Sequence, residues 1–381
     1  MLPDDLPEAL LAGRLLLPEG PTPVLIRGGR VEDMSRVAPT MADLLDREDA
    51  ASLEGRDLFS IEELADRAAA ADAGAFLLSP IDLQAVKAAG VTFAISAIER
   101  VIEERARGDS DAAAAIREKL EQVIGGAIRS VVPGTPEAAR LKQALIEQGM
   151  WSQYLEVAIG PDAEVFTKSP LLSTVGWGAP IGVRSDSDWN NPEPEIVLVV
   201  NAAGRIVGAT VGNDVNLRDF EGRSALLLGK AKDNNASCAL GPFIRLFGDG
   251  YGLDDVRSAV VELVVEGRDN FRLEGESTMA EISRDPEELV RQAMSEHHYP
   301  DGFVLFLGTL FAPVQDRGEA GRGFTHKEGD VVRISTPRIG ALVNRVTTSK
   351  AAPPWRFGVR ALMRNLAARG LLTGHGDNQE Q

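Results

Sequence analysis

Three acidic residues in the middle of the chain have the spacing of a metal site. Glu193 and Glu195 alternate at the head of an apolar run typical of a strand, so their side chains point to one face about 7 Å apart. Two carboxylates this close repel each other unless solvent or a cation separates them. Together with Asp214 they offer only oxygen ligands, which predicts a site for Mg²⁺, with Mn²⁺ or Ca²⁺ as alternatives. A solvated acidic strand end is the ordinary alternative.

Two strands must bring Asp214 to the glutamates. Glu195–Val200 and Arg205–Val211 are rich in β-branched residues, and Gly204 stands where a tight turn would fall. A hairpin centred between Gly204 and Arg205 places Glu195 opposite Asp214, with Cβ atoms about 5 Å apart. An error of one residue in this centre moves the pairing by two residues. The hairpin therefore predicts that three carboxylates converge.

The same segment resembles the fumarylacetoacetate hydrolase family. That family carries E-x-E at the head of a strand and N-D-x-S-x-R-D after the return strand, matched here by Glu193-Pro194-Glu195 and by Asn213–Asp219, with Asn216 replacing the serine. Further family elements follow the same order along the chain: Lys168-Ser169-Pro170 with Val175–Gly178, Cys238–Pro242, Gly308-Thr309, Gly329–Val332 and Ile339–Val346. The resemblance runs from about residue 80 to 346 and implies that Glu193, Glu195 and Asp214 bind the metal.

The resemblance also implies a catalytic lysine ahead of the Cys238–Pro242 element. Lys232 has the fitting downstream spacing, and Lys230 is its rival because Gly229 precedes it, as in the family's G-K pattern. Both lysines alternate on a segment expected to be extended, so both are candidates to point inward. We expect Lys232 to be the base, with its pKa lowered by a neighbouring cation and by exclusion of water.

One departure from the family indicates the type of reaction. Hydrolases and decarboxylases of the family often begin the catalytic domain with G-x-N-Y-x-x-H, whereas Gly90–Ser96 places Ser96 at the histidine position, with Glu99 nearby. Losing that histidine favours the sugar-acid dehydratase branch, which Val91–Arg107 and Val183–Glu195 also resemble. That branch converts 2-keto-3-deoxy-pentonates, such as the D-xylonate or D-arabinonate derivative, to 2-oxoglutarate semialdehyde.

This interpretation gives each residue a role toward a small 2-oxo sugar acid. The substrate's C1 carboxylate and C2 carbonyl are expected to chelate the metal, which stabilises an enolate. Lys232 would remove a C3 proton, and hydroxide would leave from C4 with Glu99 as proton donor. Hydroxyl groups expected to contact the substrate are those of Ser96, Ser173, Thr174, Thr278 and Thr309, each equally typical of an ordinary turn or strand hydroxyl.

Two other readings of these residues stay open. An acylpyruvate hydrolase or 2-oxo acid decarboxylase on the same scaffold would need an organised water and an acid/base pair near Ser96 and Glu99. A catalytically silent metabolite-binding relative is the alternative from another class. The intact set of Glu193, Glu195, Asp214 and Lys232 argues against a silent protein.

Composition excludes several classes of function. A net charge of −17 argues against nucleic-acid binding and disfavours an anionic membrane surface. The single cysteine, Cys238, permits neither an intrachain disulfide nor a cysteine-based zinc cluster. The acidic start, Met1–Asp5, differs from a signal peptide, and no apolar run approaches the roughly 20 residues of a membrane span. We expect a cytoplasmic protein, and the family resemblance implies a homodimer or homotetramer.

The length of the chain and the change in its residue pattern along the sequence predict two domains. With 381 residues, we expect a small N-terminal α/β domain at 1–78, containing a hairpin at Thr22–Val31, and a catalytic domain at 79–381. Periodicity and caps predict helices at Asp111–Gly125, at Pro136–Gly149 after Thr135, and after Asp285, and further strands at Ala259–Val265, Phe303–Leu307 and Asp330–Ser335. The fold class that the resemblance implies is α+β, with a mixed β-sandwich or β-roll catalytic domain.

Overall fold

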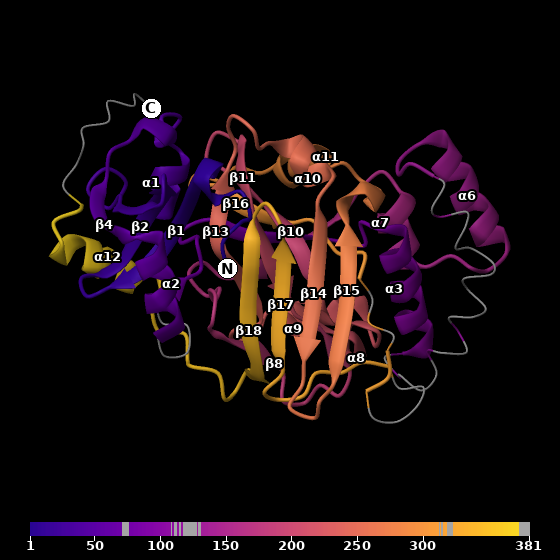
Figure 1. Cartoon of the computed structure of the whole chain (residues 1–381). Helices are drawn as coiled ribbons and strands as arrows, with labels where there is room; N and C mark the ends of the chain where they lie inside the picture. The colour runs from indigo at the N-terminus through magenta and orange to yellow at the C-terminus, as the bar shows by residue number, and fades with distance from the viewer. Residues whose placement is uncertain are drawn as a thin grey trace.

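The computed structural model describes residues 1–70, 76–107, 109, 113, 116, 128, 131–311, 313, 315–317 and 323–372. These residues form a mixed α+β fold, which confirms the predicted class (Figure 1). The helix predicted at Asp111–Gly125 lies outside the described residues, apart from positions 113 and 116. In the described part of the chain, no helix combines the length and the apolar character needed to cross a bilayer.

One large mixed sheet runs through the whole molecule. Its strands lie in the order β4-β3-β2-β1-β13-β11-β10-β16-β6-β7, and β5 pairs with β1. Their bounds are β1 Leu11–Leu17, β2 Gly20–Arg27, β3 Arg30–Asp33, β4 Arg56–Ser60, β5 Leu77–Leu78, β6 Ala85–Gly90, β7 Glu164–Ser169, β10 Pro194–Val200, β11 Ile206–Asp214, β13 Cys238–Leu246 and β16 Phe303–Phe306. Most neighbours are antiparallel, but β16 and β6 are parallel.

A second sheet of five strands packs on one face of the first and lies in front of it in Figure 1. Its order is β15-β14-β17-β18-β8, with bounds β8 Pro180–Val183, β14 Val260–Glu266, β15 Arg272–Thr278, β17 Val331–Thr336 and β18 Gly340–Thr348. Inward residues of both sheets, such as Leu198 and Leu263, form the main hydrophobic core. The predicted strands are therefore present, with ends shifted by one residue at most, except that β11 extends three residues beyond the predicted end at Val211.

Helices cover the remaining surfaces. α1 (Met41–Leu45) packs its apolar residues on the far face of the large sheet. At one end of the molecule, α3 (Ala94–Ala106), α6 (Pro136–Glu147) and α7 (Gln153–Ile159) form a helical layer with its own core (Figure 1). The other elements are α2 Ile61–Ala70, α8 Arg218–Glu221, α9 Leu228–Lys232, α10 Leu253–Arg257, α11 Pro286–Met294, α12 Val359–Ala368, the short strands β9 Asn190–Asn191 and β12 Asn216–Leu217, and 3-10 turns at Leu6–Glu8, Ala50–Ser52, Ala225–Leu227 and Met279–Glu281.

Local signals in the sequence located several element ends correctly. The predicted caps are present: the Thr135 side chain accepts from the Ala138 N–H at the start of α6, and Asp285 accepts from the Glu287 N–H at the start of α11. The predicted hairpin at Thr22–Val31 is β2–β3, and its turn consists of Gly28 and Gly29, both with positive φ.

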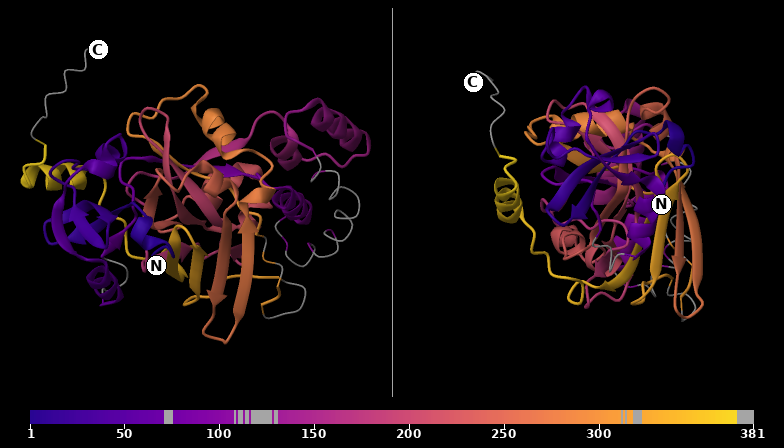
Figure 2. Two further views of the ribbon diagram at one scale, coloured as in Figure 1. Left: turned by 45° about the horizontal axis from the view of Figure 1, so that its top comes forward. Right: turned by 60° about the vertical axis from the view of Figure 1, so that its left-hand side comes forward.

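The N-terminal strands join the central sheet directly. β1 pairs with β13 through Leu11 and Ala12, so the hydrogen-bond ladder continues from the N-terminal segment into the rest of the chain. The C-terminal helix α12 lies beside this N-terminal region in both views of Figure 2, and Asn365 donates to the Glu19 carbonyl. The proposed boundary between 78 and 79 stays a prediction.

The predicted register of the β10–β11 hairpin was wrong by two residues. Glu195 pairs with Gly212, and it is Glu193 whose carbonyl accepts from the Asp214 N–H, at 3.1 Å. The turn is closed by Asn201 and Arg205, and a bulge follows at Val199/Val200, so the centre of the hairpin lies closer to the start of the chain than Gly204 suggested. A shift of two residues keeps every side chain on its predicted face, because the strand period is two.

A close backbone approach ties the Val175–Gly178 segment to the N-terminal strands. A Cβ added at Gly176 would lie 2.3 Å from the Leu77 carbonyl oxygen and 2.7 Å from the Ser79 nitrogen. We predict that Gly176→Ala lowers the free energy of unfolding by about 3 kcal/mol, since rigid backbone atoms must move. Gly248→Ala is the control, because nothing lies within 4 Å of its added Cβ. Urea denaturation of both variants measures the effect, and equal stabilities would contradict the close packing.

Candidate metal centre and its pocket

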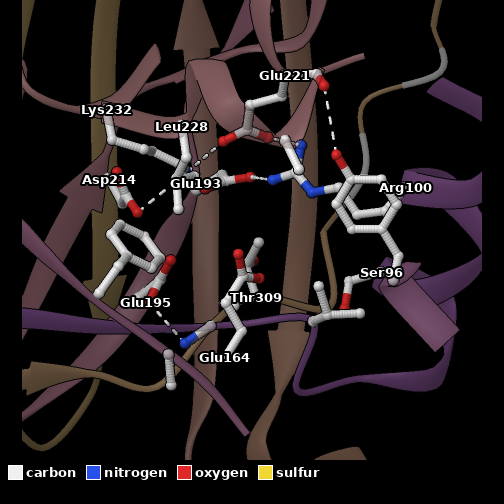
Figure 3. Close-up of a pocket in the computed structure, with 17 residues that line it drawn as sticks. Ser96, Arg100, Glu164, Glu193, Glu195, Asp214, Glu221, Leu228, Lys232 and Thr309 are labelled. Carbon is white, nitrogen blue, oxygen red and sulfur yellow. Dashed lines mark hydrogen bonds and ion pairs between the residues drawn. The ribbon is translucent and has the colours of Figure 1, made fainter. Parts of the chain in front are cut away.

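The three predicted ligands converge in one pocket. This pocket, called the carboxylate pocket below, contains about 550 Å³ of empty space, part of it open to solvent, and is lined by residues of β6, β7, α3, α8, α9, the β10–β11 hairpin and the loop after β16 (Figure 3). One carboxylate oxygen from each of Glu193, Glu195 and Asp214 lies within 4.8 Å of the others. A volume of this size suits a small metabolite.

The hairpin fixes the three carboxylates. Glu193 precedes β10, Glu195 is its second residue, and Asp214 ends β11. The Glu193 N–H donates to the Asn213 side chain at 3.2 Å, which holds the entry to the strand. Only 8%, 3% and 2% of Glu193, Glu195 and Asp214 are exposed, so the alternative of a solvated strand end does not hold.

Of the three carboxylates, Glu195 has the fewest groups that offset its negative charge. Its Oε2 accepts from the Gly308 N–H at 2.6 Å, and the described residues contain no lysine or arginine within ion-pair distance of it. Burial, Asp214 and Glu193 raise the pKa of Glu195 well above its ordinary value, although Lys232 opposes the rise. Gly308 has φ +85°, and a Cβ there would lie 2.1 Å from Thr92 Oγ1, so the close N–H contact depends on glycine.

Two buried lysines compensate the other two carboxylates. Lys232 Nζ lies 2.6 Å from Glu193 Oε2 and 3.1 Å from Asp214 Oδ2. Lys168 Nζ lies 2.6 Å from Asp214 Oδ1 and donates to the Lys232 carbonyl, which braces the end of α9. The pKa of Lys232 was predicted to be lowered beside a bound cation, and this stays a prediction. In the metal-free chain, burial lowers the pKa of Lys232, but Asp214, Glu193 and Glu221 together raise it above its ordinary value.

Arg100 connects the triad to the helical layer. From α3, its Nη2 lies 2.9 Å from Glu193 Oε1, and its Nη1 contacts Glu103, at 2.8 Å, and Glu221 (Figure 3). Burial raises the pKa of Glu221 to about 7, with Glu193 and Glu103 adding to the rise and Arg100 and Lys232 opposing it. Glu221 therefore changes its protonation state near neutral pH.

Glu164 presents a further acid to the same pocket. It begins β7, pairs with Gly90, and its Oε2 would lie 2.1 Å from a Cβ at that glycine, so Gly90 makes room for the carboxylate. Burial raises the pKa of Glu164, and Glu193 and Asp214 add to this against Arg100 and Lys232. A carboxyl group with a raised pKa is suited to donate a proton near neutral pH.

Two of the predicted hydroxyl groups line the carboxylate pocket. Ser96 lies on the first turn of α3, where its Oγ donates to the Phe93 carbonyl at 2.7 Å and accepts from the Phe93 N–H. Thr309 follows Gly308, and its Oγ1 accepts from the Phe311 N–H at 3.1 Å. Figure 3 places Ser96 and Thr309 on the side of the pocket away from Lys232.

The other predicted site residues lie elsewhere. Glu99 faces away from the pocket and accepts from Arg218 Nη2 at 3.2 Å. Ser173 contacts Ser169 and the Pro170 carbonyl, Thr174 donates to Ser79, and Thr278 ends β15 opposite Val260.

Lys230 also lies outside the pocket. It is exposed above the Phe220 ring, because α9 is helical where an extended segment was predicted, and residues two apart on a helix point to different sides.

The sequence contained signals for the residues that were missed. Arg100 lies four residues after Ser96, one helical turn, so the two share a face of α3. Glu164 and Lys168 belong to the alternating set of β7 that faces the site. Lys168 had been noted only as part of a motif, without a role.

The residues present fit a hard divalent cation. Three buried carboxylates within 4.8 Å of one another offer oxygen ligands only, and the ammonium and guanidinium groups nearby leave Glu195 uncompensated. Burial of a carboxylate beside two others is unfavourable without such a cation.

Comparison with protein families identifies one match. Residues 142–347, more than half of the chain, match the fumarylacetoacetate (FAA) hydrolase C-terminal family. The chain is 35% identical over 186 residues to the 2-dehydro-3-deoxy-D-arabinonate dehydratase of Saccharolobus solfataricus, covering 48% of this chain and 58% of that protein. It is 35% identical over 202 residues to the probable 2-keto-3-deoxyxylonate dehydratase of Haloferax volcanii, covering 53% and 66%. Each match thus spans less than two thirds of the curated relative.

Solved structures support the fold. A 2-keto-3-deoxy-D-arabinonate dehydratase complexed with magnesium and 2,5-dioxopentanoate superposes with a TM-score of 0.63 at 21% identity, covering 89% of this chain and 99% of that chain. A fumarylacetoacetate hydrolase from Exiguobacterium antarcticum superposes with a TM-score of 0.54 at 16% identity, covering 89% and 100%. At these identities the likeness concerns the arrangement of the chain.

Replacing Glu195 separates metal binding from stability. At pH 7.5 and without metal, we predict that Glu195→Gln raises the free energy of unfolding by about 2 kcal/mol, because it removes a buried, poorly compensated charge and keeps an acceptor for Gly308. The folded-state pKa is raised, so the wild type loses stability as pH rises above the unfolded value near 4, and the difference vanishes below it.

The same variant should bind Mg²⁺ at least about 100-fold more weakly, measured by calorimetric titration. Glu262→Gln, on an exposed face of β14, is the matched control and should change neither quantity. Unaltered Mg²⁺ affinity in Glu195→Gln would count against the metal centre.

Proposed function

Because the chain belongs to the fumarylacetoacetate hydrolase family, we propose that it is a divalent-metal-dependent hydro-lyase acting on a 2-keto-3-deoxy-pentonate. The product would be 2-oxoglutarate semialdehyde. The observation that carries this proposal is the cluster of three buried carboxylates beside the buried Lys232, in a pocket whose described lining residues include a further acid, Glu164, but no histidine. The names of two relatives at 35% identity support the same substrate class.

Glu193, Glu195 and Asp214 would hold the cation, with Mg²⁺ as our choice and Mn²⁺ or Ca²⁺ as alternatives. When bound, the cation would supply Lewis acidity toward the substrate's carboxylate and 2-oxo group and would offset the negative charge that now keeps Lys232 protonated. Arg100 and the Gly308 N–H keep two of the three carboxylates in place from opposite sides.

Lys232 is the proposed base that removes a C3 proton. Its Nζ is buried beside Glu193 and Asp214, and the brace from Lys168 to its carbonyl limits its movement. Desolvation already favours the neutral amine, and the carboxylates that oppose this effect are the same ones assigned to the cation.

Glu164 is the proposed proton donor to the leaving C4 hydroxyl. We assign this role to Glu164 rather than to Glu99, since Glu164 lines the pocket and Glu99 pairs with Arg218. The C3–H and C4–O bonds break and one water leaves, giving a 3,4-unsaturated acid. A proton then moves from C5 to C3, and the resulting C5 enol becomes the aldehyde. Ser96 and Thr309 are proposed to contact the sugar hydroxyls.

The lining of the pocket also bears on the hydrolase alternative. Where hydrolases of the family carry a histidine, the Ser96 hydroxyl hydrogen-bonds to the backbone of Phe93, and the described residues offer it no carboxylate partner with which to activate a water. We therefore place dehydration ahead of carbon–carbon hydrolysis or decarboxylation.

The assembled form is a separate part of the proposal. We propose a homodimer or homotetramer in the cytoplasm, as the family resemblance implied.

The substrate assay tests the reaction directly. With 2-keto-3-deoxy-D-xylonate and Mg²⁺, we expect a semialdehyde that an aldehyde dehydrogenase oxidises, with reduced cofactor followed by absorbance. Chelation by EDTA, or the variant Glu193→Ala, should reduce turnover at least about 1000-fold, because the cation carries the largest electrostatic contribution. Pyruvate, detected with lactate dehydrogenase, would indicate cleavage. Metal binding without turnover of any 2-oxo acid would indicate a silent relative.

The proton donor is tested by a matched pair of variants. Glu164→Gln should lower kcat by about 100-fold or more with little change in KM, because the leaving group loses its acid. Glu99→Gln should lower kcat by less than about tenfold, since Glu99 pairs with Arg218 and does not line the carboxylate pocket. Steady-state kinetics at saturating Mg²⁺ distinguishes the two variants. If kcat falls as much in Glu99→Gln as in Glu164→Gln, or more, Glu99 on α3 is the proton donor instead.

A further inference from the structure

A second pocket lies between the N-terminal strands and the rest of the chain. It is called the Arg14 pocket here and contains about 700 Å³ of empty space, part of it open to solvent. β1 and β5 form one wall, the segment from Leu172 to Ala179 forms another, and Phe357, before α12, closes a third side. It shares no lining residue with the carboxylate pocket.

Among the described residues of this lining, Arg14 is the one that carries a charge. It is only 5% exposed, and its Nε and Nη1 are buried without a hydrogen-bond partner among the described residues. The described residues also place no carboxylate within ion-pair distance of it. Burial lowers the pKa of Arg14, and Asp82 opposes this, but an arginine stays protonated at any pH the protein experiences.

The acid that acts on Arg14, Asp82, already accepts hydrogen bonds from other groups. Asp82 accepts from the backbone N–H groups of Met41, at 2.7 Å, and Ala42, at the start of α1, and also from its neighbour Leu83 at 2.7 Å. These bonds hold its two oxygens at the helix start, so it contributes long-range attraction to Arg14 without a contact. A buried guanidinium left in this way is unfavourable, which indicates a missing anionic partner.

The rest of the lining defines what that partner must be. Leu16, Leu77, Leu172, Val175 and Phe357 present apolar surface. The hydroxyl groups in the lining, those of Ser79 and Thr174, satisfy each other at 2.7 Å. The pocket therefore offers the guanidinium N–H donors of Arg14 and otherwise apolar walls. This combination suits neither a free phosphate nor a polyhydroxylated sugar.

We propose that the Arg14 pocket binds a small aliphatic carboxylate. The carboxylate would pair with the Arg14 guanidinium, and the hydrocarbon chain would lie against the walls formed by Leu172, Val175 and Phe357. This proposal is independent of the reaction assigned to the carboxylate pocket.

The pocket wall also adjoins the metal centre through the backbone. The Val175 N–H donates to the Cys238 carbonyl and the Leu240 N–H donates to the Val175 carbonyl, both at 3.0 Å. Cys238 in turn pairs with Asp214 across β11 and β13. A bound carboxylate would thus lie one strand away from a metal ligand, in the position of an effector rather than of a substrate.

Thermal unfolding in the presence of hexanoate tests the proposal. We expect the wild type, at saturating hexanoate, to melt about 2 °C or more above the ligand-free protein, because the ligand binds only the folded chain. Hexanamide, with the same chain and no charge, should give no shift, and neither should chloride or inorganic phosphate. A shift that is equal for hexanoate and hexanamide, or that chloride reproduces, overturns the proposal.

Two variants test whether the hexanoate shift arises in the Arg14 pocket. Arg14→Met should abolish the hexanoate shift, whereas Arg30→Met, which removes an exposed arginine paired with Asp57 on the same sheet, should keep it. If Arg14→Met fails to fold, Leu16→Trp serves as the second variant, because it fills the pocket from its 42% exposed edge and retains Arg14. Calorimetric titration with hexanoate should then show at least a tenfold weaker Kd. Retention of wild-type binding in either variant overturns the site.

Discussion

The arrangement of the site depends on the mutual repulsion among the carboxylates of Glu193, Glu195 and Asp214. Three carboxylates out of water cannot remain charged at such separations without cationic partners. The chain supplies part of the compensation itself, with Lys232 and Lys168 on Asp214 and Arg100 on Glu193. Among the described residues, Glu195 receives one N–H, from Gly308, and no cationic contact. Arg100 is shared with Glu103 and Glu221, so the three fixed cations leave the charge of Glu195 unpaired, and the proposed metal ion would supply the missing partner.

The parts of the site that followed from the sequence are those governed by strand geometry. Alternation placed Glu193 and Glu195 on one face, and the hairpin brought in Asp214, even though its register was wrong by two residues. The turn was harder, because Gly204 indicates where a chain bends but not which pair of residues closes the loop. In this hairpin Asn201 and Arg205 close it, and a bulge absorbs the extra residue.

Other parts depended on contacts between segments far apart in the chain. Whether Glu99 or Arg100 faces the pocket is decided by the rotation of α3, which a motif at Gly90–Ser96 does not specify. Ser173 and Thr174 lie between the two parts of the motif formed by Lys168–Pro170 and Val175–Gly178, yet their hydroxyls bond to Ser169 and Ser79. The pKa of Lys232 was predicted from one expected neighbour, a cation, whereas three acids surround it in the folded chain. Composition and local pattern contain none of these pairings.

The position of β7 in the sheet has a consequence for how such a protein diversifies. Glu164 is borne by an edge strand that pairs on one side only, with β6, and Ser96 lies on a helix outside the sheet. Glu195 and Asp214 belong to β10 and β11, which have partners on both sides. Substitutions at Glu164 or Ser96 thereby leave the backbone hydrogen bonds of β10 and β11 intact, whereas Lys168 on β7 and Arg100 on α3 must stay, because they pair with Asp214 and Glu193. Natural selection can exchange proton donors at these two positions and obtain a new reaction while the proposed cation ligands keep their places.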